Sequence, residues 1–326
     1  MHAARKQHTA VLKGELLALI YMGAIAFSAR KTGLALLLFP ELAALSHDVF
    51  TRPRGKWASQ PWQLIVTPTI TAFFGLFVVR HTNFNALALT LIVVASLIVI
   101  NLLESTIVPA ISAGVLPMVL VERSWIYPIG IFAGLSVLVL TLLVWKRYAP
   151  QNHILSIEEE IHSKVIDDLE APPHDRLWSV ALLVFVLAVA ALAQVTGLFF
   201  LIFPPLIVVA YEILGHPEVP NWMARPILFP LISFLTAAIG LGFCHIFDAG
   251  VMGVIVTMLC SIAILKIFKV HMPPALAVGI LPFVMKAPNY RYPISVLMGT
   301  IALMSYFWVY TRLRETAWLR RFHYER

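Results

Sequence analysis

The chain has 326 residues, of which 60% are apolar and 13% are charged, and its mean hydropathy is +0.85. Soluble domains carry roughly 25% charged residues, so this composition excludes a soluble globular protein, and the lack of alternating apolar residues argues against a membrane β-barrel. The net charge of +7 does not indicate a nucleic-acid partner, because the basic residues lie in predicted loops and tails, where the cytoplasmic face of a membrane collects them.

Apolar segments of about membrane-spanning length follow one another along the chain. The first six cover residues 14–29, 32–50, 61–79, 84–103, 106–121 and 125–145. After a polar stretch, six more cover 177–194, 197–214, 226–244, 250–268, 272–286 and 291–311. The fifth segment of each set is short, with prolines near both ends and a central glycine. We therefore predict an all-α, polytopic membrane bundle with about 10 to 12 membrane segments, two of them short proline-bounded half-helices.

The two sets of segments repeat one another. Residues 32–40 read TGLALLLFP and residues 196–204 read TGLFFLIFP, an offset of 164. Further matches keep an offset of 165, among them Trp57 with Trp222, Gly75 with Gly240, Pro109 with Pro274, Tyr127 with Tyr292 and the sequence GVLP with GILP. A near-constant offset over such a length indicates an internal duplication. We predict a first membrane repeat over residues 1–149, a linker over 150–176 and a second, homologous repeat over 177–326.

The positions of lysine and arginine predict the orientation. If all six segments of each repeat cross the membrane and the N-terminus is cytoplasmic, 18 of the 24 basic residues lie on the cytoplasmic side. This bias favours a multi-pass protein with both termini in the cytoplasm, and we expect it in a bacterial inner membrane. Six crossings make the repeats parallel, whereas re-entrant fifth segments would make them inverted. We prefer the parallel form because it keeps Lys146 and Arg147 cytoplasmic.

The linker is acidic and has a helical pattern. Ser156 and Glu159 form a capping box, and four apolar residues recur at helical spacing, Ile157, Ile161, Val165 and Leu169. The pattern predicts a short amphipathic helix that connects the two repeats, and a regulatory role for it stays open. Gly130 with Gly134, and Ser295 with Gly299, are spaced for close helix packing, which we expect at the interface between the repeats.

The residues before the fifth segments differ most between the repeats. Lys269 and His271 in the second repeat match Glu104 and Thr106 in the first. Because positions related by an axis face each other near that axis, we predict an ion pair between Glu104 and Lys269, with Lys266 assigned to the same gating group. The alternative is that both charged residues lie at the membrane surface and contact only water.

The prolines that follow predict helix starts. Proline suits the first turn of a helix, so Pro109–Ala110 and Pro274–Ala275 are expected to begin the two short helices. Helix starts carry unpaired N–H groups and a partial positive charge, which attract an anion. With Lys269 and His271 nearby, the sequence favours a small anion as ligand, bound by Lys269, His271, Pro274, Ala275, Pro109, Ala110 and Thr106. The alternative is that proline and glycine only shape the turns.

A second polar group lies at the end of the second segment. His47 and Asp48 match Tyr211 and Glu212, and Glu41 lies deeper in the same segment. A histidine beside a carboxylate can relay protons, because histidine titrates near physiological pH. We therefore assign His47, Asp48, Glu41 and Glu212 to a proton relay, with the alternative that they lie at the membrane interface.

Motifs of enzymes are absent from the sequence. It has no nucleophile elbow, P-loop, zinc-protease motif or paired catalytic carboxylates, and its two cysteines lie in apolar segments without metal-ligand spacing. We expect no enzyme activity, no cofactor and no metal site.

The chain resembles the HPP family of integral membrane proteins. The name of that family describes a His-Pro-Pro element followed by small residues, and here His271-Met272-Pro273-Pro274-Ala275 looks like it, with one inserted methionine. Residues 32–40 and 196–204, with the Pro-containing loops after them, are similar to the family pattern in both repeats. Some members are implicated in nitrite transport in chloroplasts and cyanobacteria, so the resemblance implies a small-anion transporter.

These patterns lead to one functional hypothesis with two alternatives. We expect a secondary transporter or facilitator for a small inorganic anion such as nitrite, with its site between the repeats and the lipid bilayer as its surroundings. An ion channel and a non-transporting membrane scaffold or assembly protein are the alternatives, and homo-oligomerisation stays open.

Overall fold

The structure is a computed structural model that describes residues 2–148, 164–171, 173, 177–219 and 227–324. In these residues all regular structure is helical, which confirms the all-α prediction. Seven described helices are long and apolar enough to cross a membrane. A multi-pass membrane protein is compatible with this architecture.

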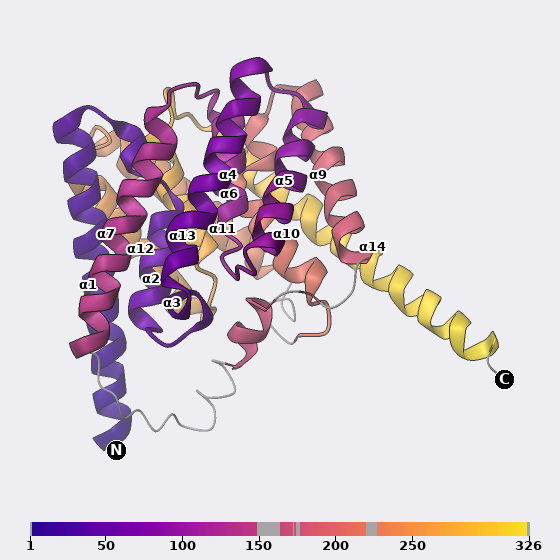
Figure 1. The fold of residues 1–326 in the computed structure, drawn as a ribbon, viewed down its shortest axis with the longest axis horizontal. Coiled ribbons are helices and arrows are strands. Elements are labelled where there is room, and N and C mark those ends of the chain that lie inside the picture. The colour runs from indigo at the N-terminus through magenta and orange to yellow at the C-terminus, as the bar shows by residue number, and fades with distance from the viewer. Residues whose placement is uncertain (1, 149–163, 172, 174–176, 220–226, 325–326) are drawn as a thin grey trace.

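The first part of the chain, up to residue 148, forms a bundle of long and short helices (Figure 1). Its elements are α1 (His2–Thr32), η1 (Ala35–Leu37), α2 (Glu41–Thr51), α3 (Lys56–Ser59), α4 (Pro61–His81), α5 (Ala86–Leu102), α6 (Ala110–Leu120) and α7 (Ile126–Tyr148). The predicted segment 32–50 is therefore broken, because a short 3-10 turn and Pro40 separate α1 from α2.

The second part has a similar order of long and short helices, with no described counterpart of α3 and with an additional 3-10 turn, η4, after its short helix. Its elements are α9 (Leu177–Thr196), η2 (Phe199–Ile202), α10 (Pro204–Gly215), α11 (Leu228–Ile246), α12 (Val251–Phe268), α13 (Pro274–Ile280), η4 (Leu281–Val284) and α14 (Arg291–Tyr324). The first helices of both parts end at a glycine with left-handed backbone, Gly33 at φ +71° and Gly197 at φ +70°. Only glycine adopts this conformation without strain, so these two residues fix the turn that leads into η1 and η2.

Large apolar side chains cover much of the outer surface. Leu16, Ile20, Phe27, Trp62, Leu87, Leu102, Leu140, Val195 and Ile267 are examples with more than half of their surface exposed. Soluble monomers rarely expose continuous apolar surface of this extent. This surface is compatible with contact to lipid, which imposes no cost on exposed apolar groups.

Successive helices run in opposite directions between two ends of the bundle. At one end Gly14 lies against Phe50 and Lys146 Nζ donates to Ala58 O at 2.6 Å. At the other end Ala86 N donates to Gln194 Oε1 at 3.0 Å. We call the first end the linker side, because residues 164–171 contact it through Arg52, and the second the far side. The polypeptide enters α1 and leaves α7 and α14 on the linker side (Figure 1).

The tightest helix crossings lie inside each part. A Cβ atom on Gly75 of α4 would lie 1.9 Å from Gly114 O of α6, and one on Gly240 of α11 would lie 2.0 Å from Gly279 O of α13. Only glycine permits such an approach of two backbones. The short helices α6 and α13 are thereby held against α4 and α11.

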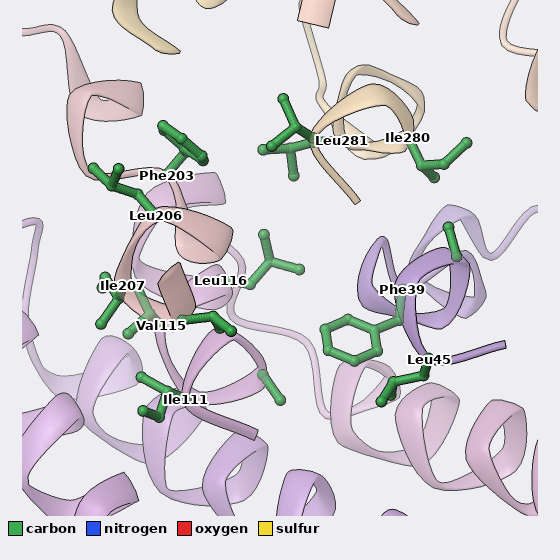
Figure 2. Packing of buried hydrophobic residues seen from close by; sticks show 14 of the residues in the cluster. Phe39, Leu45, Ile111, Val115, Leu116, Phe203, Leu206, Ile207, Ile280 and Leu281 are labelled. Carbon is green, nitrogen blue, oxygen red and sulfur yellow. The ribbon is translucent and has the colours of Figure 1, made fainter. Parts of the chain in front are cut away.

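The two parts contact each other through pairs of helices in which one helix comes from each part. α2 packs on α13 and α10 packs on α6, while α1 packs on α12 and α9 on α5. The centre of this interface is apolar, and Figure 2 shows Ile111 and Val115 of α6 beside Ile207 of α10. Each short helix is thus buried by a helix from the other part.

One expectation about helix packing is corrected. Gly130 and Gly134 of α7 lie against Leu36, Leu37 and Leu42, so this close contact is inside the first part and not between the two parts. Small residues serve here to admit the irregular backbone before α2.

In the linker, the capping box at 156–159 lies outside the described residues, while residues 164–169 are helical and bury Ile166 and Leu169.

Candidate functional site

Helix α2 presents a buried carboxylate next to a buried cation. Asp48 is fully buried in the last turn of the helix. Arg52 follows the end of α2, one turn later, and its Nη1 atom lies 3.0 Å from Asp48 Oδ1. The spacing of four residues brings the two side chains onto one face, so the local sequence itself sets up this ion pair.

The second part of the chain contributes a histidine to the same carboxylate. His271 Nε2 lies 3.3 Å from Asp48 Oδ1. His271 belongs to the connection between α12 and α13, which turns sharply because Lys269 has a left-handed backbone with φ +53°. The side chain of His47, which is buried beside Asp48, is within electrostatic reach of His271. The packing of α2 on α13 therefore creates a polar contact across the interface.

The linker completes the cluster. Glu170 Oε1 lies 2.9 Å from Arg52 Nη1, and Asp167 pairs with Arg52 Nη2. We call Asp48, Arg52, Asp167, Glu170 and His271 the interface cluster. It joins the first part, the linker and the second part, and three carboxylates share one guanidinium within it.

This imbalance of charge perturbs the groups outside the helical spans. Burial, together with the neighbouring Asp48 charge, raises the pKa of Glu170 to about 9. Burial opposes the charge of Arg52, but the Asp48, Glu170 and Asp167 charges prevail and raise its pKa above the ordinary value. The cluster therefore takes up a proton more readily than isolated carboxylates do.

A second ion pair lies nearby on the linker side. Lys266 Nζ, near the end of α12, contacts Glu15 Oε2 of α1 at 2.5 Å. Glu212 of α10 is half-buried and within electrostatic reach of Asp48. Ionisable groups inside apolar helices are costly and mark functional sites by default. The linker side thus concentrates the charged groups that both parts bury.

Glu41 is the deepest carboxyl group of the set. It lies in the first turn of α2 and only 2% of it is exposed. Ser112 of α6 is close to it, but neither carboxyl oxygen of Glu41 nor Ser112 Oγ makes a hydrogen bond of good geometry among the described residues. Tyr127 and Tyr292 both lie within electrostatic reach of Glu41.

The predicted ion pair between Glu104 and Lys269 is not formed among the described residues. Both side chains are exposed, and both residues have a left-handed backbone at the end of a helix. The contacts that do form at this turn go to Gln60, whose Oε1 accepts from Thr106 N at 2.8 Å and whose side chain donates to Glu104 O. Thr106 is thus held by α4 within its own part.

The proline-led helix starts are buried, but their N–H groups are engaged in the turn. Pro109 precedes α6 and Ala110 N donates to Ile107 O at 3.1 Å. Pro274 begins α13 and Ala275 N donates to Met272 O at 3.0 Å. These bonds satisfy donors that the sequence argument left open for an anion. Side chains, and His271 above all, are therefore the available binding groups.

Sequence reasoning missed Arg52, Glu170 and Glu15 as partners. Arg52 carried a usable signal, because an arginine four residues after an aspartate is a typical helical ion pair. Glu15 also carried one, since it is a charge in an apolar span. The approach of Glu170 depends on the path of the linker, and no local pattern encodes that path.

A cavity of about 200 Å³ lies away from the interface cluster, between η2 and the start of α14. Apolar residues line most of it, including Phe199, Phe200 and Met285, with Asn289 and Arg291 among the polar lining residues. It does not coincide with any residue that the sequence assigned to ligand binding.

Comparisons with known proteins add no relative. No family model, no curated protein and no solved structure matches the chain. The assignment of function therefore depends on the geometry and on the sequence resemblance.

Proposed function

We propose that the protein is a secondary transporter for a small anion such as nitrite, built from two homologous halves. In this proposal residues 1–149 and 177–326 are the halves, related by an axis along the membrane normal. The linker side faces the cytoplasm, because it collects most of the lysine and arginine residues, and a bacterial inner membrane is the proposed location.

Matched contacts support the duplication. Tyr127 OH donates to Ala113 O at 2.6 Å, and Tyr292 OH donates to Val278 O at 2.5 Å. All four positions keep the offset of 165 residues. The glycine crossings of α4 with α6 and of α11 with α13 match in the same way. We propose that the short helices count as passes together with the seven membrane-length helices. The alternating helix directions then support six passes per half and the parallel form.

The observation that carries the functional proposal is the contact of His271 with Asp48. The fully buried Asp48 of one half and the partly buried His271 of the other lie 3.3 Å apart. Arg52 and Glu170 adjoin this pair on the linker side. A transporter that rocks one half against the other must break and remake such contacts. A structural protein has no need to bury this many charges in an apolar interface.

The anion is proposed from the cations at this place. His271, when protonated, Lys266 and Lys269 lie on or near the turn before α13, and Arg52 lies across the interface. An anion can take the place of the Asp48 carboxylate at His271, because a protonated imidazole pairs with either negative group. The resemblance to the HPP family, in which some members are implicated in nitrite transport, supports the same ligand class.

The packed apolar contacts between the halves favour a transporter over a channel. Phe39, Leu116, Leu206 and Leu281 are buried at this interface (Figure 2). An open pore needs a continuous wet path, whereas a closed conformation of an alternating-access protein is dry at the contact. Flux measurements distinguish a transporter from the alternative of a non-transporting scaffold protein, which moves no anion.

The test is an uptake screen in proteoliposomes with nitrite, nitrate, formate and chloride. We expect saturable uptake of at least one of these anions, and loss of that uptake in His271→Ala. His245→Ala is the matched control, because His245 is exposed at the end of α11, and it should transport like the wild type. Equal flux in both variants, or flux of none of the anions, would overturn the proposal.

A further inference from the structure

We infer that Glu41 carries a coupling proton for this transport, so that the anion moves together with H⁺. This inference rests on the proposed function and extends it to the coupling ion. Its basis is the place of Glu41, a carboxyl group that is 98% buried at the junction of the two parts of the chain.

Within the described part of the chain, both carboxyl oxygens of Glu41 lack a hydrogen-bond partner and no ion pair reaches them, while hydroxyl groups lie around them. Ser112 of α6 lies close to Glu41, and Tyr127 of α7 and Tyr292 of α14 lie within electrostatic reach. Helix α13, which packs on α2, is entirely apolar from Pro274 to Ile280. A carboxylate buried without a counterion is costly, so this closed conformation favours the neutral carboxylic acid.

The two tyrosines show how Glu41 relates to the two parts. Their hydroxyl groups donate to Ala113 O of α6 and to Val278 O of α13, so each tyrosine holds one short helix. Glu41 lies within electrostatic reach of both. A movement of one part against the other changes the distance from Glu41 to one tyrosine, and hence changes the solvation of the carboxyl group.

A route for the proton follows α2. Glu41 and Asp48 are seven residues apart, which places them on one face of the helix, two turns or about 10 Å apart. Asp48 belongs to the interface cluster and contacts His271. The titratable groups of the interface cluster carry protons to the end of this helix face on the linker side. When one half rocks against the other, water enters the space between Asp48 and Glu41.

The proton balance of the step is simple. When Glu41 faces one side as a carboxylate, it binds one H⁺ and becomes a carboxylic acid, and when it faces the other side, it releases the same H⁺. One proton moved with one monovalent anion transfers no net charge. The protonated form is the one that crosses the apolar interface, since it avoids the cost of a buried carboxylate.

The experiment has two arms. In the first, infrared difference spectra of the lipid-reconstituted protein are recorded through a pH titration, and Glu41→Gln should remove one carbonyl band of a protonated carboxylic acid. In the second, nitrite uptake is measured with and without an inward proton gradient. Wild type should accumulate nitrite with the gradient, whereas Glu41→Gln should lose accumulation but retain exchange of nitrite across the membrane.

Controls separate this inference from the proposed function. Glu218→Gln alters an exposed glutamate of α10's following loop and should leave both arms unchanged, and Glu41→Asp should retain gradient-driven uptake. If the wild type moves none of the anions, the proposed function fails and the infrared arm still tests Glu41. An unchanged carbonyl band, or accumulation that persists in Glu41→Gln, overturns the inference.

Discussion

The two parts of the chain agree in their backbone crossings and differ in their polar residues. Gly75 and Gly240 each admit a carbonyl oxygen from the neighbouring short helix at nearly the same distance. The residues differ along α2 and α10, the helices that each pack on the short helix of the other part. Glu41, His47 and Asp48 of α2 are replaced by Pro205, Tyr211 and Glu212 at the equivalent positions of α10. The residues that match between the two parts hold the helices together. The residues that differ lie in the interface cluster and around Glu41. We conclude that asymmetry, more than repetition, points to the site.

The largest expected effect comes from disrupting the close helix crossings at Gly75 and Gly240. Gly75→Ala and Gly240→Ala would each place a methyl group about 2 Å from a backbone carbonyl oxygen that no rotamer change can relieve. We expect a loss of more than about 4 kcal/mol of unfolding free energy, or no folded protein. Thermal unfolding in detergent checks this. Gly242→Ala is the control on α11, because nothing lies within 4 Å of its Cβ position. Tolerance of either first substitution would contradict the crossing.

The next effect removes Arg52, the cation that contacts three carboxyl groups of the interface cluster. Arg52→Gln leaves Asp48, which is fully buried, without the guanidinium that lies 3.0 Å from it. Breaking one partner of a buried ion pair costs about 3 to 5 kcal/mol. We expect a loss of this order in the same unfolding assay, while Lys13→Gln, at an exposed lysine of α1, stays within about 0.5 kcal/mol of the wild type. A wild-type melting curve for Arg52→Gln would show that the cluster is not formed.

A smaller effect is a pH dependence of linker docking. The pKa of Glu170 rises from 4.5 to about 9 when it is docked, so the docked state binds more protons. Docking is therefore most favourable below the undocked pKa and weakens as the pH rises toward the docked pKa. Hydrogen exchange of residues 164–171, corrected for intrinsic rates, should show lower protection at high pH.

The matched variant for this experiment is Glu170→Gln. It retains a hydrogen-bond acceptor for Arg52 but does not titrate, so its protection should be flat across the same pH range. Protection that increases with pH in the wild type would reverse the predicted sign and contradict the assignment.

The smallest effect concerns the ion pair between Lys266 and Glu15. The Lys266 side chain is 49% exposed, and exposed pairs contribute about 0 to 1 kcal/mol. Lys266→Gln should lower the melting temperature slightly, and the difference should shrink at high salt. A loss as large as that of Arg52→Gln would mean that the linker side depends on this pair more than on the interface cluster.

Composition and apolar periodicity were sufficient to predict the helical class and the short helices α6 and α13. Of the 10 to 12 predicted membrane segments, seven described helices are long and apolar enough to cross a membrane. Composition and periodicity were insufficient for the contacts between the parts. The predicted pair of Glu104 and Lys269 assumed that equivalent positions face each other, but α6 packs on α10 and α13 on α2. Equivalent residues therefore lie in separate interfaces. The contact of His271 with Asp48 depends on that packing, and the contact of Glu170 with Arg52 depends on the path of the linker. Spacing along the sequence encodes neither.

The most direct test of the central claim is a proton flux driven by an anion gradient. Proteoliposomes that contain an internal pH dye are given an inward nitrite gradient without an initial pH gradient. The account predicts acidification of the interior by the wild type and by Glu218→Gln, and none by Asp48→Asn or Glu41→Gln. Acidification by Asp48→Asn at the wild-type rate, or nitrite entry without acidification in the wild type, would contradict it.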